Sequence, residues 1–390
     1  MRFAIFFTFA FLIVGASHYY IWARLIRDPA LPTGARLGLT AVLGLLAIGM
    51  PASFFLLRTL SLATARVVLF PLYVWMGLML LLLVLLACGD LVRLGLYISS
   101  RLSGSDPADP ARRLLVSRII ALGTIVIAAG ATTVAIRNAL GAVVVRRVRV
   151  VLPKLPPALH GTTIVQLTDV HLGPTLGRRW LEGVVASVND LHPDIVAVTG
   201  DLVDGSVAML RQEVEPIAAL RARRGVFFVT GNHEYYFRAA EWLPELQRLG
   251  LRVLRNERVR IGQGEASFDL AGVDDLSSRG MLAGHGPDLP GALAGRDPAR
   301  ALVLLAHQPK AVLEASRLGV DLQLSGHTHG GQFWPWRFFV HLQQPYVAGL
   351  ARHGATWIYV SDGTGFWGPP MRLGTRCEIT EVTLLSRETR

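Results

Sequence analysis

The sequence predicts a membrane segment with four transmembrane helices over residues 1–150, followed by an α/β domain over residues 151–390. Three observations support this division. Four long apolar runs lie near the N-terminus, short β-rich runs alternate with helical stretches after them, and five of the β-rich runs end in side chains that can bind metals. Together they predict a helical bundle in a membrane, followed by layered sheets with helices outside.

Each apolar run has about the length, roughly 20 residues, that spans a ~30 Å hydrocarbon core as a helix. None contains Lys, Arg, Asp or Glu, whereas Arg24 and Arg58 lie just outside, and Tyr19 and Trp22 mark an aromatic belt. Buried helices of a soluble core are the alternative, but four such runs would leave little polar surface to face water. The predicted spans are residues 3–23, 37–57, 67–87 and 119–136.

The positive charge of the chain belongs to its first part. Hydrophobic residues make up 52% of the chain, charged residues 17%, and the formal net charge is +11. Residues 1–155 contain 16 basic and 4 acidic residues, whereas the remainder contains 23 basic and 24 acidic residues. No basic stripe is left to hold a phosphate backbone, so nucleic acid is excluded as a partner.

After residue 150, seven short runs climb through Val, Ile, Leu or Phe and then break at polar residues. This pattern is typical of buried strands whose carboxyl ends open into loops, where α/β folds bind their ligands. Residues 176–191 and 239–250 are the helical candidates between them, and residues 277–300 are expected to form a loop. The predicted strands are TTIVQLTD, DIVAVTGD, GVFFVTGN, ASFDLAGVDD, ALVLLAHQP, VDLQLSGH and ATWIYVSDG.

Five of these strand ends carry candidate metal ligands. In GHTHGG, two histidines two residues apart lie in a glycine-rich loop, where both rings can reach one point. Each residue alone has another explanation: Asp169 can cap a helix, Asn232 can make a turn, and His307 can be a core histidine. Because all five ends carry such residues, we predict that they form a metal centre. The candidates are Asp169, His171, Asp201, Asp204, Asn232, His233, Glu234, His307, His327 and His329.

The mixture of carboxylate and imidazole groups predicts two divalent metal ions. Such ligands suit Mn, Fe or Zn better than Ca or Mg, which prefer oxygen alone. Asp201 lies where a carboxylate could bridge two ions. Two cations about 3.5–4 Å apart can activate a bridging hydroxide to attack a phosphate and can neutralise the charge that develops on it.

These residues resemble the calcineurin-like metallophosphoesterase superfamily, whose pattern runs D-x-H, G-D-x-x-D, G-N-H-[DE], H and G-H-x-H. The resemblance extends over residues 160–384, and the tail IYVSDGTGFWGPPMRLGTRCEITEVTL is similar to the bacterial branch with N-terminal membrane or export segments. It implies a four-layer α-β-β-α sandwich and a metal-dependent phosphoesterase, with manganese among the expected metals and a phosphodiesterase among the expected activities.

Carried over by motif, the resemblance implies two ligand sets that share one residue. One metal would be held by Asp169, His171, Asp201 and His329, and the other by Asp201, Asn232, His307 and His327.

The same resemblance gives His233 a catalytic role together with the bridging Asp201. His233 would contact the phosphate and protonate the leaving oxygen. Asp204 is expected behind the ligands, with a surface carboxylate as the alternative. Glu234 stands where the family usually has Asp, which bears on how His233 is oriented. The aspartates at 274 and 275 are interpreted as structural.

Two aromatic stretches close to the metal motifs bear on the substrate. GGQFWPWRFF at 330–339 and GFWGPPMR at 365–372 could form an apolar wall for a lipid-linked phosphate, or dip into the membrane interface, where Trp is favoured. Packing in the core is the third interpretation. Together with the membrane segment, these stretches lead us to expect two partners. One is a phosphate-ester substrate, which could be lipid-linked, and the other is membrane lipid.

One motif indicates on which side of the membrane the second domain lies. Arginine counts on the two sides are close, eight against seven, so the positive-inside rule does not decide. PARRLLVSR, before the fourth run, is similar to a twin-arginine export motif, although two ordinary flanking arginines are the alternative. We therefore expect an integral protein of the bacterial cell membrane whose phosphoesterase domain lies outside the cytoplasm.

Two functions follow from these observations. The first is a membrane-anchored, dinuclear metal-dependent phosphohydrolase that cleaves a phosphate ester or pyrophosphate. The alternative is a non-catalytic membrane scaffold or binding protein that uses the same fold, but the complete ligand set together with His233 favours the enzyme. A transporter is disfavoured, because the predicted spans lack the charges that mark ion pathways.

Overall fold

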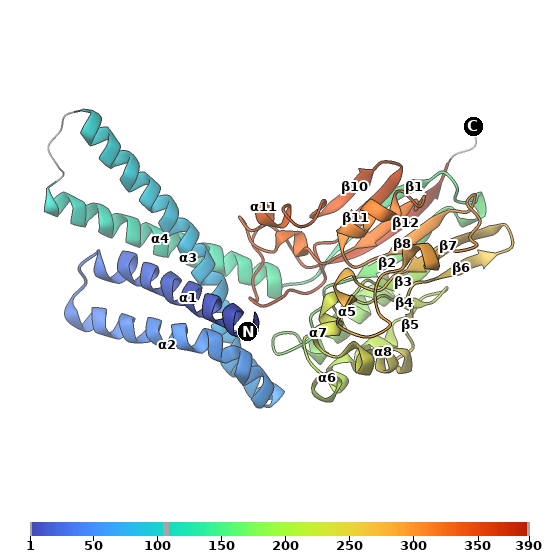
Figure 1. Cartoon of the computed structure of the whole chain (residues 1–390), viewed down its shortest axis with the longest axis horizontal. Coiled ribbons are helices and arrows are strands. Elements are labelled where there is room, and N and C mark those ends of the chain that lie inside the picture. Colours follow the sequence, from blue (N-terminus) through green and yellow to red (C-terminus); the bar gives the residue numbers. More distant parts are fainter. Residues whose placement is uncertain (1, 104–108, 388–390) are drawn as a thin grey trace. The chain divides into compact units, whose positions relative to one another are not determined.

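The computed structural model describes residues 2–103 and 109–387, and it divides the chain into two compact units (Figure 1). One unit comprises Met1–Ile136 with Gly368–Met371, and the other comprises Arg137–Trp367 with Arg372–Arg390.

The first unit consists of long apolar helices. They are α1 (Arg2–Trp22), α2 (Thr33–Thr59), α3 (Leu62–Leu102) and α4 (Pro110–Leu140), with a π-helix at Ala23–Arg27 after α1. Among the described residues, three segments are long and apolar enough to cross a membrane: Thr33–Ser53, Leu62–Leu102 and Pro110–Leu140. α1 coincides with the first predicted span, but the side chains of its first turns lie outside the described part. The count of four spanning helices therefore stays a prediction.

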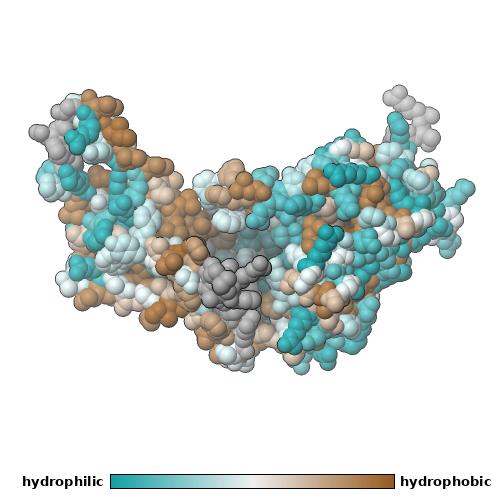
Figure 2. All heavy atoms as spheres, viewed as in Figure 1, coloured by the Kyte–Doolittle hydropathy of each residue, from teal (hydrophilic) through white to brown (hydrophobic). Residues whose placement is uncertain are grey.

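The side chains of this unit are mostly exposed, which a lipid environment allows. A small apolar core contains Ile21, Leu43 and Leu82, whereas large apolar residues such as Val67 and Ile119 face outward. Figure 2 shows brown apolar patches over these helices, interspersed with more polar side chains. α3 has 41 residues. At 1.5 Å per residue it is about 60 Å long, so only part of it fits within a ~30 Å hydrocarbon core.

The second unit contains two six-stranded sheets. The first has the order β1-β12-β2-β3-β4-β5, with β2 to β5 parallel to one another. The second has the order β10-β11-β9-β8-β7-β6, in which β7, β8, β9 and β11 are parallel. The first sheet comprises β1 (Val144–Leu152), β2 (Thr162–Leu167), β3 (Ile195–Val198), β4 (Val226–Phe228), β5 (Arg252–Val253) and β12 (Glu378–Ser386). The second comprises β6 (Glu257–Gln263), β7 (Ala266–Gly272), β8 (Leu302–Leu305), β9 (Leu322–Ser325), β10 (Gly349–His353) and β11 (Thr356–Val360).

The two sheets pack face to face around one apolar core. Val303 and Leu305 of β8 lie in this core together with Ile164 of β2. Successive side chains of a strand point to opposite faces, so Leu302 and Leu304 pack on the outer side, against α9 (Leu289–Ala292) and α10 (Val312–Ala315).

Helices also cover the outer face of the first sheet (Figure 1). They are α5 (Arg178–Asp190), α6 (Val207–Val214) and α8 (Ala239–Arg248). α5 buries Leu181, Val184, Val185 and Val188, the spacing of one apolar helix face. The layers are therefore helix, sheet, sheet and helix.

All seven predicted strands are present, and the two predicted helices are α5 and α8. The structure adds β1, β5, β6, β10 and β12, which sequence patterns did not identify. β5 has only two residues, and β6 and β10 lie at sheet edges, where a strand needs no continuous apolar run.

The second unit begins before the predicted boundary at residue 151. β1 pairs in parallel with β12, from Val144 opposite Glu378 to Leu152 opposite Ser386. Val150 and Leu152 enter the core between the sheets, while Arg146 pairs with Glu378 at 2.7 Å. The arginines of VVVRRVRVVL therefore belong to a strand rather than to the flank of a membrane helix.

We expect a fragment of residues 137–390 to fold, and a fragment of residues 153–390 to unfold or aggregate. The shorter fragment lacks the core side chains of β1 and leaves the edge of β12 unpaired. Size-exclusion chromatography and amide hydrogen exchange of β12 measure the difference. Equal exchange protection of β12 in the two fragments would contradict this boundary.

Candidate metal centre

The predicted ligands lie at one edge of the sandwich. They follow parallel strands of both sheets, and parallel strands present their carboxyl ends together. Asp169 and His171 follow β2, Asp201 follows β3, Asn232 follows β4 at the start of α7 (Asn232–Tyr236), His307 follows β8, and His327 and His329 follow β9.

The backbone of these loops is strained. Ten residues other than glycine have positive φ in the described part of the chain, and half of them are predicted ligands. Such conformations cost on the order of 1–3 kcal/mol each and cluster at functional sites. The five ligands are Asp169 (φ 52°), His171 (φ 50°), Asp201 (φ 52°), His327 (φ 70°) and His329 (φ 51°).

Asp169, His171 and His329 form one group of donor atoms, all within 4.8 Å of one another. His171 Nε2 lies 3.0 Å from His329 Nε2, which in turn lies 3.4 Å from Asp169 Oδ1. The backbone N–H of His327 donates to both oxygens of Asp169, at 3.0 and 2.9 Å. This bond fixes the carboxylate against the loop after β9.

Asp201, His307 and His327 form a second group within the same distance. Asp201 Oδ2 lies 3.1 Å from His307 Nε2 and 3.8 Å from His171 Nε2, so it lies between the two groups. Asn232 Oδ1 lies 3.2 Å from His307 Nε2. The structure thus brings all seven predicted ligands into two adjacent groups, with Asp201 between them.

The donor atoms fit cations. His171 Nδ1 donates to Asp204 Oδ1 at 2.9 Å, and His307 Nδ1 donates to the carbonyl of Thr199 at 2.8 Å, which assigns the tautomer of each neutral ring. Each ring then presents the lone pair of Nε2 to the centre, where carboxylate oxygens also point. Lone pairs that face one another need a proton or a cation between them, and this mixed set suits Mn, Fe or Zn.

Two glycines allow the loops to approach this closely. A Cβ at Gly231 would collide with the carboxylate of Asp201, and a Cβ at Gly326 would collide with the carboxylate of Asp169. Both positions therefore require glycine for steric reasons.

Burial and neighbouring charges set the protonation of the centre. Burial opposes ionisation of Asp201, but His307 and His233 outweigh it and hold the pKa of Asp201 well below its usual range. Burial also opposes protonation of His307, but Asp201 outweighs it and raises the pKa of His307 well above its usual range. A proton on His307 would therefore supply positive charge in the absence of a metal, and a bound cation would supply it in place of that proton and leave the ring neutral.

His233 borders both groups, and with His171 and Asp201 it forms a third set of donor atoms within 4.8 Å of one another. Its Nδ1 donates to Asp204 Oδ1 at 2.6 Å, the oxygen that also accepts from His171. Its Nε2 lies 3.9 Å from Asp201 Oδ2. Burial disfavours the charged forms of both Asp204 and His233, but their neighbours outweigh it. The imidazoles of His171 and His233 lower the pKa of Asp204 to about 2. The carboxylates of Asp201 and Asp204 raise the pKa of His233 to about 9. One carboxylate thus orients a predicted ligand and the predicted acid.

Aromatic side chains flank His233. The ring of Tyr236 lies edge-on at 5.2 Å between centroids, and the ring of Trp367 lies edge-on at 6.0 Å. Both aromatic residues are exposed. Gln332 holds the backbone of Trp367 at both polar atoms, donating to its carbonyl at 2.8 Å and accepting from its N–H at 3.1 Å.

Glu234 does not orient His233. Its carboxylate accepts the backbone N–H groups of Gly231 at 2.7 Å, Asp201 at 3.0 Å and Leu202 at 2.8 Å. Burial and the nearby Asp201 raise the pKa of Glu234 to about 7. Glu234 therefore joins the loops after β3 and β4, and the replacement of Asp by Glu leaves the orientation of His233 to Asp204.

Arg372 is a residue of this site that sequence reasoning missed. It is fully buried, and its guanidinium donates to the carbonyls of His329 at 3.1 Å and Gly365 at 3.1 Å and to Thr375 Oγ1 at 3.2 Å. Its Nη2 also lies 3.1 Å from His329 Nδ1. Arg372 is distant from the metal motifs in sequence, so their spacing gave no signal for it.

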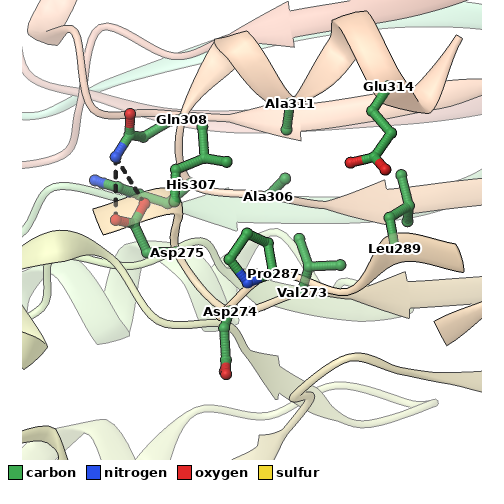
Figure 3. Close-up of a pocket in the computed structure, with 11 residues that line it drawn as sticks. Val273, Asp274, Asp275, Pro287, Leu289, Ala306, His307, Gln308, Ala311 and Glu314 are labelled. Carbon is green, nitrogen blue, oxygen red and sulfur yellow. Dashed lines mark hydrogen bonds between the residues drawn. The ribbon is translucent and has the colours of Figure 1, made fainter. Parts of the chain in front are cut away.

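The aspartates at 274 and 275 are engaged elsewhere. Asp274 forms a two-pronged ion pair with Arg255, at 2.9 and 2.8 Å. Asp275 accepts the amide of Gln308 at 3.0 Å, beside His307 in a pocket whose other end contains Glu314 (Figure 3). Both carboxylates are satisfied by protein donors, which agrees with their interpretation as structural residues.

Comparison with known proteins identifies relatives of this domain. Residues 162–331 match the family described as calcineurin-like phosphoesterase. A "transmembrane protein with metallophosphoesterase domain" of Bos taurus is 43% identical over 264 residues, 65% of this chain and 60% of that protein. An "uncharacterized metallophosphoesterase" of Campylobacter jejuni is 37% identical over 284 residues, 72% of this chain and 73% of that protein.

The likeness is partial in two respects. The chain spans 52%, 56% and 60% of the length of three curated relatives that it matches. Among solved structures, a dimetal phosphatase of Danio rerio is 14% identical with a TM-score of 0.37, over 52% of this chain and 88% of that chain.

Asp204→Asn should weaken metal binding. The carboxylate holds both His171 and His233 through Nδ1, and loss of such an outer partner typically lowers metal affinity or activity about 10–100-fold. Metal content after dialysis and competition with a chelator measure the affinity. The exposed Asp190→Asn is the matched control. Unchanged affinity in Asp204→Asn would show that Asp204 does not support the centre.

Proposed function

Because this chain belongs to the calcineurin-like phosphoesterase family, we propose that it is a membrane-anchored hydrolase of phosphate esters that uses two divalent metal ions. One observation carries the proposal: two groups of buried or partly buried donor residues lie side by side, and the Asp201 carboxylate lies between them. A single carboxylate placed in this way suits two cations rather than one.

We assign one metal to Asp169, His171, Asp201 and His329, and the other to Asp201, Asn232, His307 and His327. When bound, the two ions would supply a reactive hydroxide and neutralise charge on the phosphate. The donor set supports Mn, Fe or Zn in this role.

In this proposal, His233 carries the proton that the leaving oxygen needs. Its Nδ1 is held by Asp204, which leaves Nε2 to exchange a proton with the substrate. Nε2 lies beside Asp201, on the metal-facing side of the ring. Asp204 acts through His233 and His171 and is therefore a positioning residue.

The organic part of the substrate would lie against Tyr236 and Trp367. Both rings are exposed and contact His233, so a group attached to the leaving oxygen would meet them first. An apolar group is the best complement to two such faces. Together with the membrane segment, this supports a lipid-linked phosphate monoester, diester or pyrophosphate as substrate.

The location proposed for the protein is the bacterial cell membrane, with the phosphoesterase domain outside the cytoplasm. Three segments that could cross a membrane and relatives named as transmembrane proteins support the membrane location. The paired Arg112 and Arg113, at the start of the last of these segments, support the orientation.

Purified full-length protein loaded with Mn²⁺ should hydrolyse at least one of three substrates: p-nitrophenyl phosphate, bis-p-nitrophenyl phosphate, or dioleoyl phosphatidic acid in mixed micelles. A chelator should abolish turnover, and added metal should restore it. His329→Ala should reduce turnover ~100-fold or more, because metal stabilisation of the transition state is worth several kcal/mol.

The exposed His192→Asn controls for loss of a histidine, since asparagine tolerates the positive φ of this position. Metal-loaded protein without turnover on any of the three esters would instead support a non-catalytic scaffold.

His233→Ala should slow phenyl phosphate more than p-nitrophenyl phosphate. Phenolate needs a proton to leave, and loss of a general acid costs typically 10²–10⁴-fold, whereas p-nitrophenolate leaves with little help. Steady-state kcat for the two esters, at equal metal content, measures the difference. An equal loss on both esters would mean that His233 binds phosphate or metal rather than donating the proton.

A further inference from the structure

An exposed aromatic loop follows the metal motif of β9. We use this name for residues 334–342, which include the short helix α11 (Arg337–Val340). Five of its large apolar side chains are between 52% and 82% exposed: Trp334, Trp336, Phe338, Phe339 and Leu342. Apolar side chains that gather in this way mark a binding surface more often than a free surface.

The core does not account for these residues. Of the aromatic stretches noted in the sequence, Phe333 and Phe366 are buried and pack inside the second unit. The side chains of the aromatic loop begin immediately after Phe333 and point outward. The structure therefore divides the aromatic residues into a buried pair and an exposed set.

The base of the aromatic loop is held in place by hydrogen bonds. The N–H of Trp334 donates to the carbonyl of Leu373 at 3.0 Å, and the N–H of Leu373 donates to the carbonyl of Gln332 at 2.9 Å. On the other side, Thr328 Oγ1 donates to the carbonyl of Val347 at 2.6 Å. The exposed side chains are thus presented on a fixed base beside His327 and His329.

The charge around the aromatic loop favours a lipid surface as its partner. Between Asp321 and Asp362 the sequence contains no Asp or Glu, while Arg337 and Arg352 are present. Trp and Phe together with Arg, in a stretch of sequence without acids, form a composition that binds at the interface of a bilayer with anionic head groups. A chain with segments able to cross a membrane also keeps such a surface at high local concentration.

We propose that the aromatic loop inserts into the membrane interface and brings the metal centre to the lipid surface. The side chains of interfacial segments enter about 5–10 Å, to the boundary between head groups and acyl chains. The loops of His327 and His329 would then lie close to the head-group layer. This inference does not depend on the proposed hydrolase activity, since it concerns where the loop lies.

The test uses full-length protein at one chain per lipid nanodisc, with spin labels on single cysteines. Cys88 is exposed and is replaced by Ala, while Cys377 is buried and stays unlabelled in folded protein. Labels at Phe338→Cys and Leu342→Cys should collide more often with oxygen, which enters lipid, than with the water-soluble Ni(II)–EDDA complex. In discs with anionic lipid, Arg337→Gln should reduce the ratio of oxygen to nickel collisions.

Met281→Cys is the matched control, because Met281 is an exposed apolar residue of the same unit outside the aromatic loop. Its label should collide more often with the nickel complex. The same aqueous pattern at 338 and 342 would overturn the proposal. Shielding from both reagents would also overturn it, because the aromatic loop would then pack against protein; single-chain discs leave only the helices of the same chain for that role.

Discussion

Two buried carboxylates, Asp169 and Asp201, impose the main constraint on this fold. Each faces imidazole nitrogens of neighbouring loops, and neither has an arginine or lysine as ion-pair partner within the described residues. A buried charge without compensation is among the most expensive features that a folded protein can contain. The surrounding loops compensate part of this negative charge with backbone N–H groups and with histidines that can carry a proton. Bound cations would compensate the rest.

The centre is supported by links between loops rather than by any one loop. Asp204 connects the loop after β2, through His171, to α7, through His233. Glu234 connects α7 to the loop after β3, and Arg372 connects the C-terminal segment to the loop after β9. Strained φ values at five ligands persist because these links over-determine the backbone. Removal of Asp204 or Glu234 therefore disturbs at least two ligand loops together.

The part of this arrangement that sequence could predict is the part that depends on strand order. Parallel strands end at one edge, so ligand residues after β2, β3, β4, β8 and β9 were expected to meet, and the structure brings them together. Asp204 was expected behind the ligands, but the link made by Arg372 could not be predicted, because nothing local distinguishes the buried Arg372 from a surface arginine. β1 was missed for a related reason. In the sequence its arginines resemble those that flank a membrane helix, and only the structure shows that Arg146 and Arg147 pair with Glu378 and Glu381 of β12. Which aromatic residues are exposed could not be predicted either, because exposure depends on the tertiary structure.

The charges around the centre are only partly suited to binding a negatively charged phosphate. Asp169, Asp201 and Asp204 give the edge of the sandwich a negative charge that would repel a phosphate ester in the absence of cations. The sequence between Asp321 and Asp362, which includes two ligands and the aromatic loop, adds no acid to that charge. This stretch of sequence therefore adds no carboxylate to those that metal ions would neutralise. Under the proposed function, metal ions would therefore control the affinity for phosphate, and the exposed aromatic side chains of residues 334–342 would be available for apolar contacts.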